Sequence, residues 1–181
     1  MAIILGDDDP NLLRGTRRDD FIFGFDDDDR LLGNEGDDRL YGGDDHDQLF
    51  GGTGDDDLFS GRDGDRIWGQ AGRDQLEGEG GHDRLNGGGG ADKLEGGTGE
   101  DRFIFGRGSG KDTIDDFDRD EDVIDLRAYA NISFEDLVLD TTTHRGDTTI
   151  DLGLANGGAA GVNVLKVEDV TDLSSADFLL A

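Results

Sequence analysis

Hydrophobic residues recur every nine positions through the first part of the chain. From Gly6 to Ile104 the sequence divides into eleven consecutive nonapeptides without an insertion or deletion, and the eighth position of every one is apolar. Glycine opens ten of the eleven blocks. Because glycine reaches positive φ and allows close backbone approach, the first half of each block is expected to turn. The last three residues are typical of a very short strand with one side chain facing inward.

A unit of nine residues is too short to close a loop, so two consecutive units are expected to form one flattened coil. Position four supports this, because it is aspartate in blocks one, three, five and seven and arginine or glycine in the blocks between. Aspartate also tolerates the left-handed conformation better than most residues. Stacked coils pair their strands in parallel. The predicted fold is therefore all-β, a parallel β-roll (a right-handed β-helix or solenoid of nonapeptide repeats) over residues 1–104.

Composition changes this picture in one respect. Hydrophobic residues make up 33% of the chain, glycine contributes 32 residues, and 45 acidic against 17 basic residues give a net charge of −28. Such a chain is expected to stay disordered unless a counter-ion is part of the fold. The charge argues against nucleic acid as a partner, because phosphates would be repelled. The absence of cysteine excludes disulfides and thiolate zinc sites.

The sixth position carries the candidate metal ligands. It is aspartate in ten blocks and Asn11 in the first. Stacking brings residues eighteen apart together, and two carboxylates about 5 Å apart repel by about 3 kcal/mol at an effective dielectric of 20. A divalent cation reverses the sign of this interaction. Ca²⁺ suits it because it accepts six to eight oxygens at tolerant angles, whereas Mg²⁺ demands stricter geometry and transition metals prefer nitrogen or sulfur. The ten aspartates are Asp20, Asp29, Asp38, Asp47, Asp56, Asp65, Asp74, Asp83, Asp92 and Asp101.

These blocks resemble the nonapeptide G-G-x-G-x-D-x-U-x of the repeats-in-toxin (RTX) family, a Ca²⁺-binding β-helix repeat. Three blocks show the pattern: GNEGDDRLY from Gly33, GGDDHDQLF from Gly42 and GGTGDDDLF from Gly51. The resemblance implies that the sixth-position aspartates and the carbonyls around positions two and four bind several calcium ions. It implies up to eight full carboxylate pairs, from Asp20/Asp38 to Asp83/Asp101, with Asn11/Asp29 as a weaker ninth. The implied carbonyl donors include Gly36, Gly52, Gly54, Gly72, Gly88 and Gly90.

After Ile104 the period stops, and residues 105–181 are expected to form a small β-rich cap over the open end of the roll. Asp112–Phe117 and Asp122–Leu126 are predicted as short strands, and Ser133–Leu137 as a capped helical turn. Asp147–Leu152 and Val162–Val167 are predicted as a strand pair. Ser174–Leu180 is predicted as a short terminal helix or an extended tail.

The order of these pieces resembles the region that follows the repeats in secreted RTX proteases and alginate epimerase modules. The resemblance implies an uncleaved type I secretion signal at the C-terminus, where Asp177 precedes three hydrophobic residues. The type I secretion machinery is then an expected partner, and the expected location is extracellular. Met1–Pro10 has no basic segment and only a short apolar one, so no cleavable N-terminal signal is expected. No apolar run approaches the roughly 20 residues of a membrane span.

No catalytic motif is found: H-E-x-x-H and G-x-S-x-G are both absent. We therefore expect a non-enzymatic, calcium-binding RTX module that folds on binding Ca²⁺ outside the cell. A stripe of apolar residues at position nine is a candidate surface for a polysaccharide or a cell-surface partner, with burial by the cap or a second copy as the structural alternative. The alternative function is the non-catalytic C-terminal part of a secreted enzyme, either a metalloprotease or a mannuronan epimerase. A third is a calcium-dependent adhesion protein. The stripe comprises Phe23, Leu32, Tyr41, Phe50, Phe59 and Trp68.

Overall fold

The structure is a computed structural model that describes residues 1–129, 132–139, 141–144, 146–155 and 163–181. The first sheet contains β1 (Ile3–Leu5), β3 (Phe21–Phe25), β5 (Arg39–Gly43), β7 (Asp57–Arg62), β9 (Gln75–Gly80), β11 (Lys93–Glu95), β13 (Lys111–Ile114), β15 (Thr141–His144), β16 (Asp147–Asp151) and β17 (Val164–Val167). The second contains β2 (Leu12–Arg14), β4 (Arg30–Glu35), β6 (Gln48–Thr53), β8 (Arg66–Gly72), β10 (Arg84–Gly90), β12 (Arg102–Ile104), β14 (Val123–Asp125) and β18 (Phe178–Leu179). The helices are α1 (Phe134–Leu139), α2 (Leu152–Ala155) and the 3₁₀ turn η1 (Ser175–Asp177).

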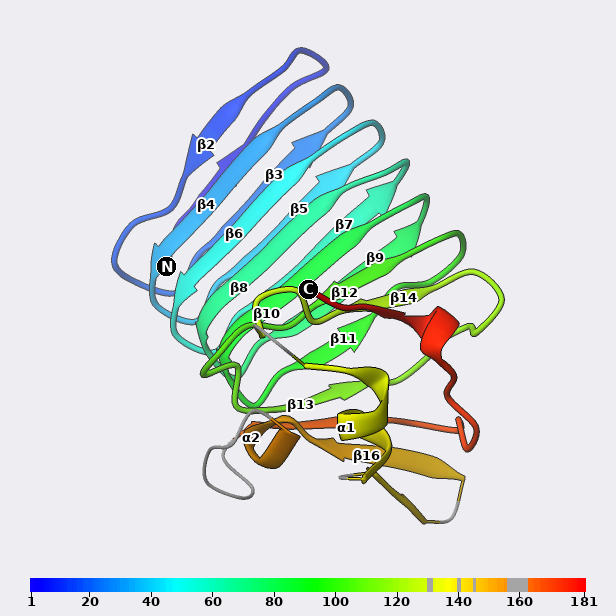
Figure 1. Ribbon diagram of the computed structural model, residues 1–181. Coiled ribbons are helices and arrows are strands. Elements are labelled where there is room, and N and C mark those ends of the chain that lie inside the picture. The colour runs from blue at the N-terminus through cyan, green and yellow to red at the C-terminus, as the bar shows by residue number, and fades with distance from the viewer. Residues whose placement is uncertain (130–131, 140, 145, 156–162) are drawn as a thin grey trace.

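Successive nonapeptides alternate between the two sheets, which lie on opposite sides of a flattened coil (Figure 1). Within each sheet the repeat strands pair in parallel, and partners lie eighteen residues apart, as in Leu40 with Leu58 and Leu31 with Leu49. The predicted parallel β-roll and its eighteen-residue coil are therefore confirmed.

The core is a double row of position-eight side chains between the sheets. From the second block to the last these side chains are completely buried, whereas Leu13 in the first block is only partly buried. Successive side chains of a strand point to opposite faces, so position eight faces the core while positions seven and nine face away from it. The buried row is Ile22, Leu31, Leu40, Leu49, Leu58, Ile67, Leu76, Leu85, Leu94 and Phe103.

The turns between strands depend on left-handed backbone at positions two and four. At position four, Asp27, Asp45 and Asp63 have φ values of 76°, 80° and 69° in the odd blocks, and glycine takes the same conformation in most even blocks. The expectation that aspartate serves there as a left-handed residue is confirmed. At position two even Phe25 adopts positive φ, at 91°.

The C-terminal region extends the same two sheets beyond Ile104. Strand β13 adds to β11 and β14 adds to β12, both in parallel. Strand β17 then pairs in parallel with β13, and the antiparallel strands β16 and β15 follow on its other side, while β18 pairs with β14. The predicted strand pair of Asp147–Leu152 with Val162–Val167 is confirmed, because β16 pairs with β17. Val162 lies outside the described residues.

The helical turn predicted at Ser133–Leu137 is α1. The Ser133 amide and hydroxyl donate to Asp136 Oδ2 at 2.9 and 2.7 Å, and the Asp136 amide donates back to Ser133 Oγ at 3.2 Å. This reciprocal arrangement satisfies amides that a helix N-terminus otherwise leaves unpaired. No helix in the described part of the chain is long and apolar enough to cross a membrane.

Candidate metal centre

The sixth-position aspartates form two columns, one along each edge of the roll. Even blocks supply one column, beginning at Asp20, and odd blocks supply the other, beginning at Asn11. The ten aspartates are at most 2% exposed. A carboxylate is rarely buried so completely without a partner, so each of its oxygens needs an account.

The first oxygen of each aspartate joins neighbouring coils. Oδ1 accepts a hydrogen bond from the backbone amide of the residue eighteen positions earlier, as from Asp38 to Asp56 and from Asp65 to Asp83, both at 2.8 Å. Every coil in the column is therefore held to the next by a carboxylate as well as by its strands. The Asn11 amide donates to Asp29 Oδ1 in the same way, at 2.7 Å.

The second oxygen is different, because in nine aspartates it is buried and has no hydrogen-bond partner. Buried polar atoms are almost always paired, so nine equivalent exceptions indicate a ligand rather than nine defects. The nine are Asp29, Asp38, Asp47, Asp56, Asp65, Asp74, Asp83, Asp92 and Asp101.

A glycine at position one makes the space in which each of these oxygens lies. A Cβ built on Gly69 would lie less than 3.0 Å from both Asp74 Oδ2 and the carbonyl oxygen of Gly87. The same overlap with an aspartate Oδ2 recurs in eight blocks, from Gly24 to Gly96. The glycine thus leaves a small cradle in which a carboxylate oxygen and a backbone carbonyl of the next coil come together.

Backbone carbonyls at position four also face the space between coils. A Cβ on Gly54, Gly72 or Gly90 would overlap the carbonyl oxygen of the glycine eighteen residues earlier. At position two, Gly52 and Gly88 meet the carbonyls of the earlier coil in the same way. The predicted carbonyl donors therefore lie on the same edges as the aspartates, and Gly36 contributes one of these oxygens. Whether any of them binds an ion stays a prediction.

This donor set consists of oxygen alone. No group of three histidine, cysteine, aspartate or glutamate side chains lies close enough to hold a metal within the described ranges, so carbonyl oxygens must complete any site. Carboxylate plus carbonyl oxygen is the chemistry that Ca²⁺ prefers. His46 is exposed, and His82 accepts a hydrogen bond from the Glu100 amide at 2.9 Å, so neither faces the cradles.

Burial makes these carboxylates hard to ionise without a cation. It raises the pKa of Asp74 from 3.8 to about 7 and that of Asp83 to about 8, and in each the neighbouring aspartates eighteen residues away add to the shift. The pKa values of Asp47 and Asp56 rise to about 8 and about 6, again chiefly through burial. At neutral pH a positive charge in the cradle would therefore stabilise the fold.

Toward both ends of the roll, protein groups donate hydrogen bonds to carboxylates of the columns, so these carboxylates do not lack a partner. The Thr16 amide and hydroxyl each donate to Asp20 Oδ2 at 2.7 Å, so Asp20 differs from the other nine predicted ligands. At the other end Asp112 and Asp122 continue the columns, accepting from the amides of Asp92 and Asp101 at 3.1 and 2.9 Å.

These last two aspartates were not predicted as ligands, because the nine-residue period ends at Ile104. The Asp118 amide donates to Asp122 Oδ2 at 2.8 Å, and a hydrogen bond from Ser109 lowers the pKa of Asp112 against the dominant effect of burial, which raises it to about 7. A signal for both was present, because each stands two residues before a buried isoleucine, as position six stands before position eight.

Outside the cradles, the position-nine residues form two separate stacks rather than one stripe. Tyr41 stacks between Phe23 and Phe59 on the first sheet, with ring centroids 4.7 and 5.0 Å apart. Phe50 and Trp68 stack at 4.5 Å on the second sheet. The expectation of a single stripe is wrong because alternate blocks face opposite ways. The rings cover one another's faces, so they present mainly edges to solvent.

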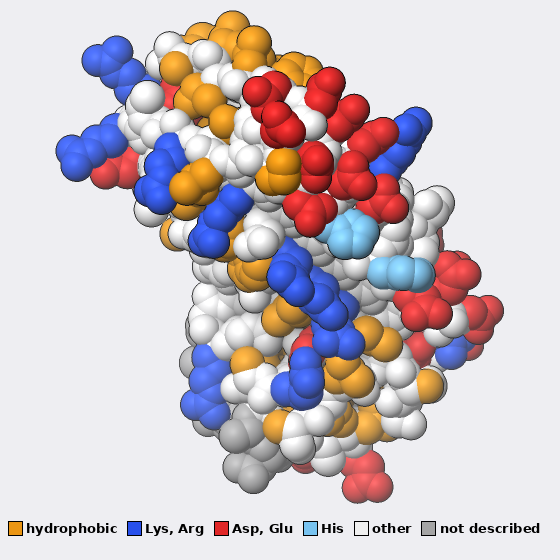
Figure 2. All heavy atoms as spheres, turned by 90° about the horizontal axis from the view of Figure 1, so that it is seen from above, with side chains coloured by type: hydrophobic (Ala, Val, Ile, Leu, Met, Phe, Trp, Pro, Cys, Tyr) orange, Lys and Arg blue, Asp and Glu red, His pale blue; other side chains and the backbone are white. Residues whose placement is uncertain are grey.

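The surface charge is divided in a regular way. Acidic side chains gather along one edge of the roll with histidine side chains beside them, and a row of basic side chains crosses the adjoining face (Figure 2). The acidic edge contains the exposed turn residues Asp26, Asp27, Asp28 and Asp45. The basic row is Arg66, Arg84 and Arg102, which are register neighbours on β8, β10 and β12.

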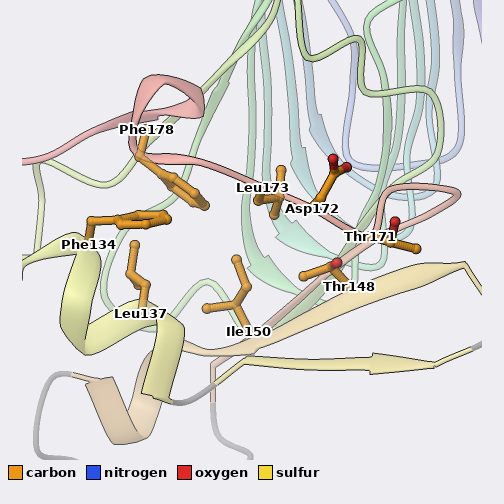
Figure 3. A pocket seen from close by; sticks show the side chains of 8 residues that line it. All are labelled: Phe134, Leu137, Thr148, Ile150, Thr171, Asp172, Leu173 and Phe178. Carbon is orange, nitrogen blue, oxygen red and sulfur yellow. The ribbon is translucent and has the colours of Figure 1, made fainter.

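The cap contains a pocket of about 190 Å³ between α1, β16 and the C-terminal segment. Phe134, Leu137, Ile150, Leu173 and Phe178 point into it (Figure 3). Its lining is apolar apart from two threonines and Asp172 at the rim, and it lies away from the aspartate columns. It offers no cluster of groups for acid–base or nucleophilic chemistry.

A parallel roll with columns of buried, unpartnered carboxylates in glycine cradles defines a calcium-binding repeat protein. The family model for the RTX calcium-binding nonapeptide repeat matches overlapping segments that together run from residue 5 to residue 114. The chain belongs to this family.

Solved structures with a related fold include the extracellular lipase LipA of Serratia marcescens, with a TM-score of 0.55 and 18% identity. That match covers 99% of this chain and 40% of the lipase, so the chain spans less than half the length of that relative. The AlgE6R3 subunit of the Azotobacter vinelandii mannuronan C5-epimerase also matches, with a TM-score of 0.40 and 23% identity over 91% of this chain and 80% of that one. No curated protein sequence matches.

Proposed function

We propose that this chain is a non-catalytic module that folds when Ca²⁺ enters the glycine cradles after export from the cell. The observation that carries the proposal is the set of nine buried Oδ2 atoms without partners. Bound calcium would supply positive charge between coils. The chain's own carboxylates and position-two and position-four carbonyls would hold it.

The same atoms indicate where along the roll the ions would bind. Each carboxylate that lacks a protein donor is a candidate ligand, whereas Asp20 already has Thr16 as its partner. We therefore expect the sites to lie between the second coil and the cap, with fewer ions toward the N-terminal end. Extracellular modules with oxygen ligands of this kind bind Ca²⁺ at about 10⁻⁴ to 10⁻³ M. Binding and folding would then be one event, absent at the low calcium concentration of a cytoplasm.

The packing of the C-terminus supports export before folding. Asp177 is 2% exposed and caps η1 through the Ser174 amide, and Phe178 lies in β18 against β14. In the folded protein the segment that resembles a type I secretion signal is part of the cap. An exporter that reads it would have to do so while the chain is unfolded, which low calcium would ensure.

Circular dichroism in the far ultraviolet tests the folding proposal. Titration with Ca²⁺ from a chelator to 10 mM should convert a coil spectrum to a β spectrum cooperatively, while Mg²⁺ at equal concentration should not. A full β spectrum in chelator at neutral pH, unchanged by Ca²⁺, would show that the cradles need no cation. Isothermal titration calorimetry that starts from the calcium-free chain would count the ions.

A second candidate function is binding of an acidic polysaccharide along the arginine row. Arg66 and Arg84 are exposed, Arg102 is half-buried, and in the described residues none of the three makes an ion pair. Like charges in register on neighbouring strands repel, so a linear polyanion along the roll axis would relieve this repulsion. The stacked aromatics favour sugar binding less, because their faces are covered.

The arginine row can be tested with a defined oligogalacturonate. Arg66→Gln with Arg84→Gln should weaken binding at least tenfold, whereas Arg62→Gln with Arg73→Gln, two exposed arginines outside the row, should leave it nearly unchanged. Equal loss in both double variants would indicate general charge attraction, and no binding by the wild type would exclude this ligand. Retention of the calcium-induced β spectrum would show that either result is independent of folding.

A further inference from the structure

A small hollow lies across β4, β6 and β8, three neighbouring strands of the second sheet (Figure 1). Its volume is about 340 Å³. The residues that line it stand at positions nine, one, two and three of the repeat. The candidate calcium ligands among the side chains stand at position six, and the arginine row stands at position seven. The hollow is therefore distinct from both of these features.

The middle of the hollow is open because its central residue is a glycine. Asn34, Gly52 and Gln70 are register partners on the three strands, so two amide side chains flank a residue that has no side chain. Neighbouring strands lie about 4.8 Å apart, which separates the two flanking residues by about 10 Å. Gly51 and Gly52 are buried, whereas Asn34 and Gln70 are exposed. The result is a glycine floor between two amide walls, with room for a ligand of one ring.

Gln70 occupies a backbone conformation that glycine adopts more easily. The φ angle is 81° at Gln70 and 83° at Asn34, while Gly52 and Gly88, which belong to the same column, have values of 126° and 98°. Asparagine tolerates this left-handed region, but glutamine is strained in it. Glycine would avoid the strain at this position, as it does in the neighbouring coils. A glutamine at this cost to stability indicates a role for its side-chain amide.

The polar groups of the hollow can both donate and accept hydrogen bonds. Within the described residues, the side-chain amide of Gln70 and the hydroxyl of Thr53 have no hydrogen-bond partner. Asn34 Nδ2 donates to a backbone carbonyl oxygen at 2.8 Å, which leaves Asn34 Oδ1 as an acceptor. The Glu35 carboxylate is 3.4 Å from Arg17 and has further lone pairs to offer. A ligand with several hydroxyl groups matches this mixture of donors and acceptors.

The apolar wall of the hollow narrows the choice of ligand. Phe50 contributes its edge, because the Arg30 guanidinium lies over the ring at 4.8 Å and Trp68 stacks on it at 4.5 Å. A planar aromatic ligand such as a nucleobase would therefore find no open ring face for stacking. The Glu35 carboxylate disfavours an anion, and its ion pair with Arg17 reduces the attraction for a cation. A neutral ring with hydroxyl groups and a C–H face remains.

We propose that this hollow binds a single neutral pyranose unit. The amides of Asn34 and Gln70 and the carboxylate of Glu35 hydrogen-bond the hydroxyl groups of the sugar. The edge of Phe50 contacts its C–H groups. The site requires the folded roll, but it does not depend on the arginine row or on an acidic ligand.

Isothermal titration calorimetry of the folded protein in 10 mM Ca²⁺ measures the affinity. The probes are the methyl glycosides of glucose, galactose and mannose, each titrated to about 50 mM. At least one should bind saturably, and the uronate with the same ring should bind at least threefold more weakly because its carboxylate meets Glu35. Trp68 is the only tryptophan of the chain and stacks on Phe50, so a change in its fluorescence should accompany binding.

Gln70→Gly removes the amide and installs the residue that suits the local backbone. It should keep the calcium-induced β spectrum and weaken binding of the sugar at least tenfold. Glu79→Gly is the matched control, because Glu79 also stands at position two with a positive φ of 68° but lies on β9 of the other sheet. This variant relieves similar strain and should leave the affinity unchanged.

Three results would each overturn the proposal: no saturable binding of any of the three glycosides, tighter binding of the uronate, or equal affinity in the wild type and Gln70→Gly. The β spectrum in calcium is recorded for every variant. A normal spectrum without sugar binding would remove the sugar site and leave the calcium-dependent folding proposal intact.

Discussion

Replacing Asp74 with asparagine should change the stability of the protein in opposite directions with and without calcium. Asp74 Oδ1 accepts a hydrogen bond from the Asp56 amide at 3.0 Å, whereas Oδ2 is buried without a partner. In Asp74→Asn the amide oxygen can keep the first interaction. The amide nitrogen then takes the place of Oδ2 in the cradle of Gly69, near the carbonyl oxygen of Gly87.

The magnitude without calcium follows from the pKa. Burial raises the pKa of Asp74 from 3.8 to about 7, so ionising it inside the roll at pH 8 costs about 4 kcal/mol relative to the unfolded chain. Asparagine carries no charge and can donate where the carboxylate could not. The metal-free variant should therefore be more stable than the metal-free wild type, by up to about 4 kcal/mol. With calcium the sign reverses, because an N–H group cannot bind a cation.

Urea unfolding followed by the fluorescence of Trp68 measures both states. Metal-free measurements need a fixed concentration of a stabilising osmolyte so that the wild type is folded. In parallel, isothermal titration calorimetry in the same osmolyte should show that the altered site of the folded variant binds calcium at least tenfold more weakly. Asp63→Asn is the matched control, because Asp63 is exposed and asparagine also tolerates its φ of 69°.

The opposite result would be that Asp74→Asn destabilises the metal-free roll and leaves its calcium affinity unchanged. That combination would mean that the carboxylate is needed as a charged group in the apo fold and is no metal ligand. A gain of stability in both conditions would keep the burial argument but remove Asp74 from the calcium sites.

Three further outcomes are expected. In calcium, Gly69→Ala should lower the free energy of unfolding by roughly 1–3 kcal/mol, because its Cβ would lie less than 3.0 Å from a backbone carbonyl oxygen. A Cβ at Gly106 meets nothing within 4 Å, so Gly106→Ala should be nearly neutral in urea unfolding, and equal losses in the two variants would contradict the cradle. With calcium depleted and the same osmolyte present, the urea midpoint should fall as pH rises from 5 to 8. Folded-state pKa values raised above 3.8, such as that of Asp47 at about 8, stabilise the protonated roll, and this stability is lost as pH rises through the folded pKa; a rising midpoint would refute the burial effect. Leu58→Ala, at a fully buried position, should cost about 2–5 kcal/mol by the same assay, whereas Leu12→Ala, 55% exposed, should cost little; similar losses would mean that the row of position-eight residues is no core.

The period of the sequence predicts the roll well because the same side chain does the same job in every coil. Position eight had to face inward, and all ten residues from Ile22 to Phe103 are buried. The aspartate columns follow from the eighteen-residue register alone. What the repeat could not predict is which carboxylate oxygens lack a partner, since that depends on a donor such as Thr16 reaching Asp20.

The cap was harder to predict, because its spacing is irregular. The register steps from eighteen residues to twenty between Leu94 and Ile114 and to twenty-one between Phe103 and Ile124. A search for a fixed period stops at such steps even though the sheets continue through them. The boundary at residue 104 is therefore a change of period, and a division into two domains there stays a prediction.

Alternation of the blocks between two sheets also limits how such a gene can lengthen or shorten. Loss of one nonapeptide would leave the local pattern intact but transfer every later strand to the opposite face. Arg84 would then leave its row for the face of the Phe23–Tyr41–Phe59 stack, and β13 would meet the wrong sheet. Loss of two nonapeptides would remove one whole coil and disturb neither face. The nonapeptide is thus the repeat of the sequence, but the pair of nonapeptides is the structural unit. Only whole pairs can be added or deleted without moving later side chains to the opposite face of the roll.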